Sequence, residues 1–313
     1  MSSAGLPILA LLLAGALVAA GCTSAPQATD DRPSVVVTLL AYQWLATAIG
    51  GDSVVVTNIV PPGSSPHEFD PTPRDLVRLY EADLVLVNGV EIEAWFTQAV
   101  KDLPSSVKVL RAADSAKPLL AAGAHTISLG ESDEEEGPND PHLWLDPIRL
   151  AAVGDDLTDA LASLVPVEER ESLVARGQSV HRQLLDLNAT IGTALGGDCA
   201  RRTILTTHDS MAYLADRYDL SVVSILGISP DEEPSPARLQ QIAEAATERG
   251  ITTILVEPNI STATAQALAE QIHGTTQPLD PVESINPHTD LGADYLKVMT
   301  ANLPSLEVAL GCP

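Results

Sequence analysis

Residues 167–195, VEERESLVARGQSVHRQLLDLNATIGTAL, contain no proline and carry apolar residues at helical spacing. Pro166 breaks the chain just before them. At about 1.5 Å per residue this helix would be about 43 Å long, which is enough to run along a whole domain. The sequence therefore predicts one long helix over residues 166–196 that joins two lobes.

Short apolar runs on both sides of this helix alternate with helical patterns. Before it the runs are VVVTL, SVVVTNIV, DLVLVN and SVKVL, and after it they are RTILTT, LSVVSIL, TTILVE and TTQPLD. Alternation of strand and helix predicts parallel sheets with helices on both faces. We therefore expect an α/β protein with two lobes, residues 35–165 and 197–313, each a parallel sheet flanked by helices.

Four segments each hold one potential metal ligand. They are SPHEFDPTPRD with His67, NDPHLWLDP with His142, TTHDSMAYLADRY with His208 and QPLDP with Asp280. Three imidazoles and one carboxylate make a complete tetrahedral shell for a zinc-like ion. All except His208 lie beside a proline, where the chain turns, and such turns are typical of strand ends that face a cleft. The sequence therefore predicts a metal site built from these four side chains.

The remaining helical histidines have simpler structural interpretations. His181 lies within the long polar helix, and His273 precedes Gly274 at a helix end, where a cation suits the helix dipole. His288 follows Pro287 at the expected start of the last helix. None of these three is predicted to bind metal.

The segments SPHEFDPTPRDL, EADLVLVNGVEIEAWF, DPHLWLDP, TTHDSMAYLADRYDL and ILVEPN, in this order, resemble those of one protein family. It is the metal-binding family of ABC-transporter solute-binding proteins, the zinc and manganese receptors of cluster A-I. The resemblance extends from Val35 to Leu303. It implies that the four side chains above hold a divalent ion, that one rigid helix joins the lobes, and that an ABC permease in the membrane is the partner.

The ligand set also bears on which metal is bound. Imidazole-rich shells suit zinc, whereas oxygen-rich shells suit manganese. Members of the family with Glu at the position of His208 favour manganese, so the resemblance implies zinc here, with manganese as the alternative. Glu257, at the end of the strand TTILVE, is a candidate partner for a ligand histidine.

The amino terminus predicts export. Residues 8–20, ILALLLAGALVAA, are too few to span a bilayer and are typical of a signal-peptide core. We therefore expect a signal peptide over residues 1–21 and a flexible tether over residues 22–34. Cys22 follows small residues, as at the lipid-attachment site of a bacterial lipoprotein, and the alternative is cleavage after Ala20 that leaves a plain thiol. The protein is then either lipid-anchored on the outer face of the cytoplasmic membrane or periplasmic.

The other two cysteines are Cys199 and Cys312. If Cys22 is acylated, they remain as a pair in an oxidising compartment, where disulfides persist. A bridge between them would close a long loop, which is worth about 4 to 5 kcal/mol in the chain-entropy account. The alternative is two free thiols.

The composition is strongly acidic, with 42 acidic and 17 basic residues and a net charge of -25. Such a chain repels nucleic acid and anionic headgroups, so we expect no nucleic-acid partner, membrane contact only through a lipid anchor, and a monomer. Local acidity is greatest in the loop 123–140, which holds His125 and the run Asp133 to Glu136. This loop is either a low-affinity antenna for cations or a solvated segment without a role.

Three classes of function fit the metal site. The first is a transport receptor that captures zinc and delivers it to a permease. The second is a zinc hydrolase with Glu68 or Asp209 as general base, and the third is a metal-dependent surface adhesin. An enzyme needs an open coordination position for water, which four protein ligands would close, and the chain has no HExxH helix. We therefore predict a receptor and no enzymatic activity.

Overall fold

The computed structural model describes residues 30–90, 92–129, 139–228, 234–258 and 261–313. The predicted signal peptide, Cys22 and the acidic run 133–136 lie outside the described residues. Residues 32–313 form one compact unit. Among the described residues, no helix has the length and apolar character needed to cross a bilayer.

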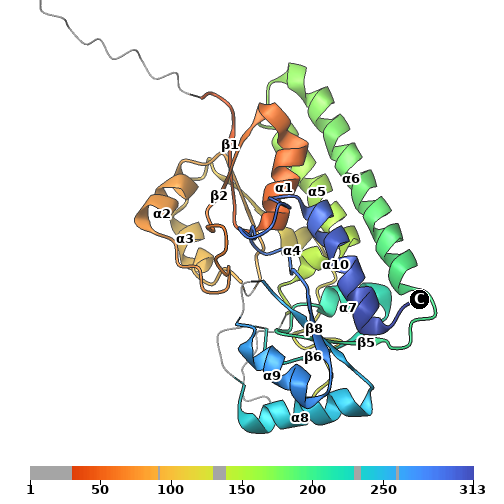
Figure 1. Ribbon diagram of the computed structural model, residues 1–313. Coiled ribbons are helices and arrows are strands. Elements are labelled where there is room, and N and C mark those ends of the chain that lie inside the picture. Colours follow the sequence, from red (N-terminus) through yellow and green to blue (C-terminus); the bar gives the residue numbers. More distant parts are fainter. Residues whose placement is uncertain (1–29, 91, 130–138, 229–233, 259–260) are drawn as a thin grey trace, which may run out of the picture. The chain divides into compact units, whose positions relative to one another are not determined.

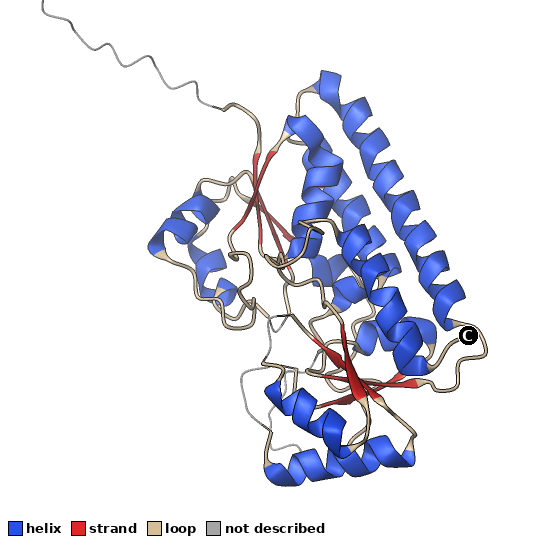
Figure 2. Cartoon of the chain, viewed as in Figure 1, coloured by secondary structure: helices blue, strands red, loops and turns tan. Residues whose placement is uncertain are grey.

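Within the described ranges, eight short strands form two parallel sheets of four (Figures 1 and 2). The first sheet has the order β2-β1-β3-β4 and consists of β1 (Ser34–Val37), β2 (Val55–Asn58), β3 (Leu84–Val87) and β4 (Lys108–Arg111). The second sheet has the order β6-β5-β7-β8 and consists of β5 (Thr203–Thr206), β6 (Ser221–Ser224), β7 (Thr253–Val256) and β8 (Thr275–Pro278). The predicted α/β class with two parallel sheets is confirmed.

Helices cover both faces of each sheet. Before the linking helix they are α1 (Leu40–Gly50), α2 (Pro73–Tyr80), α3 (Phe96–Asp102), α4 (Ala112–Ser115) and α5 (Pro147–Ala162). After it they are α7 (Ala212–Tyr218), α8 (Pro236–Glu248), α9 (Ala263–Gln271) and α10 (Tyr295–Leu310). Short 3-10 turns span Gly51–Ser53 and Leu143–Leu145.

The two faces of the first sheet bury alternate residues of the same strands. Val35 and Val37 of β1 pack in the core that contains α1 and α5, whereas Val36 packs in the core that contains α2 and α3. Side chains of a strand point alternately to opposite faces, so both sets must be apolar when both faces are covered. This explains why the strands read as continuous apolar runs.

The helix α6 (Val167–Leu195) joins the two sheets, as predicted (Figure 1). Its buried residues recur every three or four positions, which is the spacing of one helix face: Leu173, Gly177, Val180, Leu184, Leu187, Ile191 and Leu195. A Cβ at Gly177 would lie 2.2 Å from the Thr158 hydroxyl of α5, so only glycine permits this close approach of the two helices. Arg176 donates hydrogen bonds to the carbonyls of Ile49 and Gly50 at the end of α1, at 2.7 and 2.8 Å. The first half of α6 is therefore fixed to the first lobe.

The other end of α6 is tied to the carboxyl terminus. A disulfide joins Cys199, just after α6, to Cys312, just after α10. The backbone beside it is paired as well, because Arg201 N–H donates to the Leu310 carbonyl at 2.9 Å. The second lobe therefore begins and ends at the same point.

Candidate metal centre

Three histidines and one glutamate meet at the carboxyl ends of the strands. His67 follows β2, His142 precedes α5, His208 follows β5 and Glu283 follows β8. Their four ligand atoms all lie within 4.8 Å of one another. The side chains of His142 and His208 are fully buried, and those of His67 and Glu283 are 5% and 10% exposed. This group therefore lies in the crevice where ligands of open α/β sheets bind.

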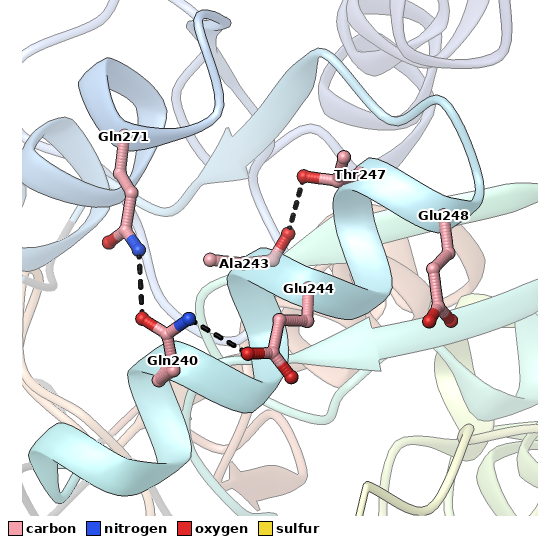
Figure 3. Close-up of a pocket in the computed structure, with 6 residues that line it drawn as sticks. All are labelled: Gln240, Ala243, Glu244, Thr247, Glu248 and Gln271. Carbon is pink, nitrogen blue, oxygen red and sulfur yellow. Dashed lines mark hydrogen bonds between the residues drawn. The ribbon is translucent and has the colours of Figure 1, made fainter.

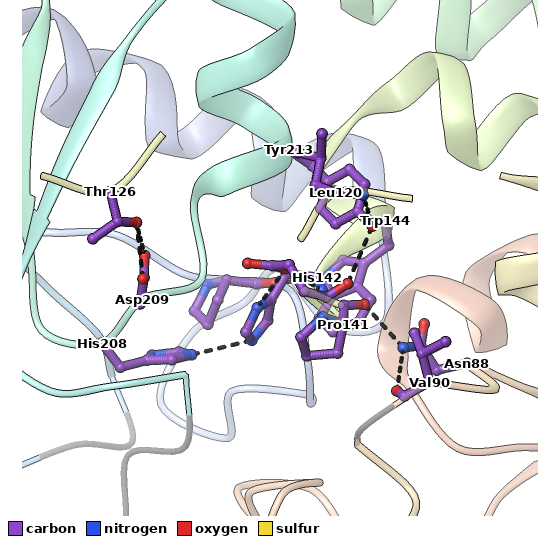
Figure 4. A network of polar contacts seen from close by, with 12 residues as sticks. Asn88, Val90, Leu120, Thr126, Pro141, His142, Trp144, His208, Asp209 and Tyr213 are labelled. Atoms are coloured by element: carbon purple, nitrogen blue, oxygen red, sulfur yellow. Dashed lines mark hydrogen bonds and ion pairs between the residues drawn. The ribbon is translucent and has the colours of Figure 1, made fainter. Parts of the chain in front are cut away.

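The separations within the group fit a tetrahedral zinc ion. His142 Nε2 lies 3.3 Å from His208 Nε2 (Figure 4). It lies 3.4 Å from His67 Nε2. Glu283 Oε1 lies 3.4 to 3.5 Å from each of the three Nε2 atoms. Four donors around zinc, with bonds of about 2.0–2.1 Å, are about 3.3 Å apart. Glu283 Oε1 is buried and makes no hydrogen bond of normal geometry to a described residue, as expected of an oxygen placed to bind a cation.

The position of Asp280 differs from the sequence prediction. The sequence predicts Asp280 as the fourth ligand, but the carboxylate that the structure brings to the imidazoles is that of Glu283. Asp280 Oδ1 instead accepts a hydrogen bond from the Val282 N–H at 2.8 Å, and Asn302 pairs with both backbone groups of Asp280, at 2.9 and 2.7 Å. Asp280 thus shapes the turn from which Glu283 projects.

His142 is held by a neighbouring carboxylate. Asp140 Oδ1 accepts from the His142 backbone N–H at 2.8 Å and lies 3.1 Å from His142 Nδ1. Burial alone would lower the pKa of His142, but the Asp140 and Glu283 carboxylates outweigh it and raise that pKa to about 9. Asp140 therefore orients the ring so that Nε2 faces the cleft.

His208 has an equivalent support from the second lobe. Glu257 Oε1 lies 2.6 Å from His208 Nδ1 and also accepts from the Thr207 hydroxyl at 3.0 Å. Burial lowers the pKa of His208, but Glu257 and Glu283 outweigh it and place that pKa well above its ordinary value. Glu257 therefore contacts His208, a candidate ligand histidine, as the sequence suggests.

His67 is the candidate ligand histidine with the lowest pKa. Burial lowers its pKa, and Glu283 offsets this only in part. Its loop precedes α2, where Thr72 and Asp75 form a capping box and Pro73 occupies the first turn. Gly63, on the same loop, donates its N–H to the Ile285 carbonyl at 2.9 Å. The His67 loop and the Glu283 loop are therefore hydrogen-bonded to each other across the crevice.

The pKa values predict a strong pH dependence of zinc binding. Burial raises the pKa of the Glu283 carboxyl, but the three imidazoles outweigh it and hold that pKa well below its usual range, so it binds no proton near pH 7. His142 and His208, whose pKa values are raised, carry protons that zinc must displace. We expect release of about two protons per zinc at pH 7, and an affinity that falls about a hundredfold per pH unit below it. Calorimetry in buffers of different ionisation enthalpy measures this release, and a value near zero would contradict the protonated pair.

Two residues of the site, the candidate ligand Glu283 and the supporting residue Asp140, were not identified from the sequence. Glu283 lies three residues after Asp280, and spacing alone does not decide which carboxylate enters the cleft. Asp140 precedes His142 by two residues, a spacing that places its carboxylate on the His142 backbone. This two-residue spacing is the sequence feature from which Asp140 could have been identified.

Two other histidines, His125 and His181, contact carboxylates outside this group. His125 Nε2 lies 3.2 Å from Asp216, and His181 Nδ1 lies 3.0 Å from Asp155. Both pairs are more than one-third exposed. Neither belongs to a cluster of three or more potential ligands within the described ranges.

An open groove of about 340 Å³ lies between α8 and α9 (Figure 3). It is lined by Gln240, Ala243, Glu244, Thr247, Glu248 and Gln271. Gln240 links the two helices, since it donates to Glu244 at 2.8 Å and accepts from Gln271 at 3.2 Å. The lining has no histidine or cysteine and resembles an ordinary polar surface.

Comparison with known proteins agrees with the geometry. The curated relatives include the zinc-binding lipoprotein AdcA of Streptococcus pneumoniae strain R6, which is 29% identical over 306 residues. That match covers 96% of this chain but only 60% of the relative, so the chain spans about three fifths of the length of such relatives. The high-affinity zinc uptake system protein ZnuA of Bacillus subtilis strain 168 is 27% identical over 283 residues, with 90% of this chain and 88% of that protein covered.

Solved structures match over most of the fold. The Zn(II)-bound ZnuA-like domain of Streptococcus pneumoniae AdcA has a TM-score of 0.74 and 27% identity, with 89% of this chain and 99% of that chain covered. The laminin-binding protein of Streptococcus agalactiae, described as bifunctional with adhesin and metal transporting activity, has a TM-score of 0.74, 26% identity and the same coverage. The profile of the family described as zinc-uptake complex component A, periplasmic, matches residues 35–309. Since this match covers most of the chain, the protein belongs to the periplasmic zinc-uptake component A family.

Proposed function

We propose that the protein is an extracytoplasmic receptor that binds one zinc ion between its two lobes and delivers it to an ABC permease. The observation that carries this proposal is the buried group of His67, His142, His208 and Glu283, whose donor separations match a tetrahedral zinc ion. All four proposed ligands come from one chain, so the site needs no second copy. The zinc names of the relatives support the cargo, and the lipoprotein name of one supports attachment through Cys22.

The chemistry of the site favours binding over catalysis. Four protein donors complete a tetrahedral shell, whereas catalytic zinc keeps one position for water. Asp209, a candidate general base in a hydrolase, accepts the Thr126 hydroxyl at 2.7 and 2.8 Å on its two oxygens (Figure 4). A carboxylate engaged in this way is poorly placed to activate a zinc-bound water.

The proposed cargo is tested by metal competition. Protein purified without added metal is expected to contain about one zinc per chain and to prefer zinc over manganese, because three imidazoles suit zinc better than a hard cation. His208→Glu is expected to shift this preference toward manganese by replacing a nitrogen donor with oxygen. Elemental analysis followed by zinc and manganese titrations measures both effects. Manganese bound more tightly than zinc by the wild-type protein would refute the zinc assignment.

A further inference from the structure

Trp144 lies between the two loops that carry His142 and Glu283. Its indole Nε1–H donates to the Pro281 carbonyl at 2.8 Å. Trp144 is two residues after His142, and Pro281 is two residues before Glu283. Its ring also packs on the His142 imidazole, with centroids 5.3 Å apart and planes at 65°. One side chain therefore contacts both of these ligand-bearing loops.

The surroundings of Trp144 fix its position. The side chain is fully buried, and the Tyr42 ring meets it edge-on at 6.4 Å. The Tyr295 hydroxyl, at the start of α10, donates to the Trp144 carbonyl at 2.7 Å. The Trp144 side chain and the Trp144 backbone are therefore held by different elements. Its indole N–H is fixed in position as a hydrogen-bond donor.

The loop that receives this hydrogen bond has an unusual backbone. Val282, between Pro281 and Glu283, has a φ of 59°, which a β-branched residue rarely adopts. Such a conformation persists only where the surrounding structure imposes it. Here Asn302 holds the start of the turn at Asp280, and Trp144 holds the next carbonyl. The direction of the Glu283 side chain therefore depends on these two contacts.

We propose that Trp144 is a positioning residue for metal binding that fixes the distance between His142 Nε2 and Glu283 Oε1 and thereby the preference for zinc. This inference rests on the proposed zinc site. The separation of 3.4 Å suits a tetrahedral shell with short bonds. A looser pair of loops accommodates the larger, more highly coordinated shell of manganese at a lower cost.

The test is Trp144→Phe, which keeps an aromatic ring and removes the indole N–H. We expect the dissociation constant for zinc to rise by about 10- to 100-fold, as for the loss of other groups that orient metal ligands. Manganese affinity is expected to change less, so the ratio of zinc affinity to manganese affinity decreases. The matched control is Trp95→Phe, because the Trp95 indole N–H is buried without a hydrogen-bond partner among the described residues. This control is expected to leave both affinities unchanged.

A double-mutant cycle with Glu283→Ala separates positioning from general stability. If Trp144 acts through Glu283, Trp144→Phe adds little further loss of zinc affinity in the Glu283→Ala background. Additive losses, or an unchanged zinc to manganese ratio, would overturn the inference. If Trp144→Phe does not fold, Tyr295→Phe, which releases the Trp144 carbonyl, replaces it in the same cycle with the same two criteria. Failure of the wild-type protein to bind zinc is a different result, because it refutes the proposed function itself.

Discussion

His142→Ala and His208→Ala are each expected to weaken zinc binding by about a hundredfold to a thousandfold. Four-ligand structural zinc sites bind with about 10–16 kcal/mol, so one ligand contributes about 2.5–4 kcal/mol. Both side chains are fully buried, and water replaces an imidazole poorly in such a site. Each removal also takes the imidazole partner from a buried carboxylate, Asp140 in one case and Glu257 in the other. Competition against a chelator of known zinc affinity measures the loss.

The matched control for these variants is His181→Ala. His181 also contacts a carboxylate, Asp155, but it lies on the half-exposed surface between α5 and α6. Its removal is expected to leave zinc affinity unchanged. Wild-type affinity in His142→Ala or His208→Ala would refute the proposed ligand set, whatever the control shows.

Glu283→Ala is expected to cause a loss of similar size, whereas Asp280→Asn is expected to cost less than about tenfold. Alanine at position 283 removes the carboxylate that lies between the three imidazoles. Asparagine at position 280 keeps an oxygen that can accept the Val282 N–H, so the turn is preserved. Burial and the nearby Glu283 and Glu257 carboxylates raise the pKa of Asp280 to about 6, so at pH 7.5 this group is still mostly ionised. Asp280→Asn therefore also removes a negative charge close to the site. That charge explains a small remaining effect.

The same chelator competition, at pH 7.5, distinguishes the two carboxylates. A severe loss in Asp280→Asn together with a mild one in Glu283→Ala would assign the fourth ligand to Asp280 after all. Thermal unfolding of both ion-free variants is the accompanying control, because Asp280 contributes to the turn and Glu283 does not.

Much of the fold could be predicted from the sequence because its determinants are local. Most strands are short apolar runs, because both faces of each sheet are buried. A continuous apolar run is easily told apart from the spaced apolar residues of a helix. The linking helix α6 follows from an uninterrupted helical pattern after Pro166. The three histidines of the candidate site were also picked out from short motifs: His67 and His208 follow β2 and β5, whereas His142 lies just before α5.

The fourth proposed ligand could not be predicted in the same way. Which of two nearby carboxylates enters the crevice depends on the turn between them, and that turn has a positive φ at Val282, a residue type that gives no sign of it. The conformation is imposed by Asn302 and Trp144, which are distant in sequence. Contacts of this kind arise only from tertiary packing.

The disulfide between Cys199 and Cys312 makes the second lobe a covalently closed ring. Both proposed ligands from this half, His208 and Glu283, lie inside the ring. A single proteolytic cut anywhere within it leaves the two fragments bonded to each other rather than free to separate. The proposed receptor, cut once within this ring, therefore keeps His208 and Glu283 on one molecule until a reductant opens the bond.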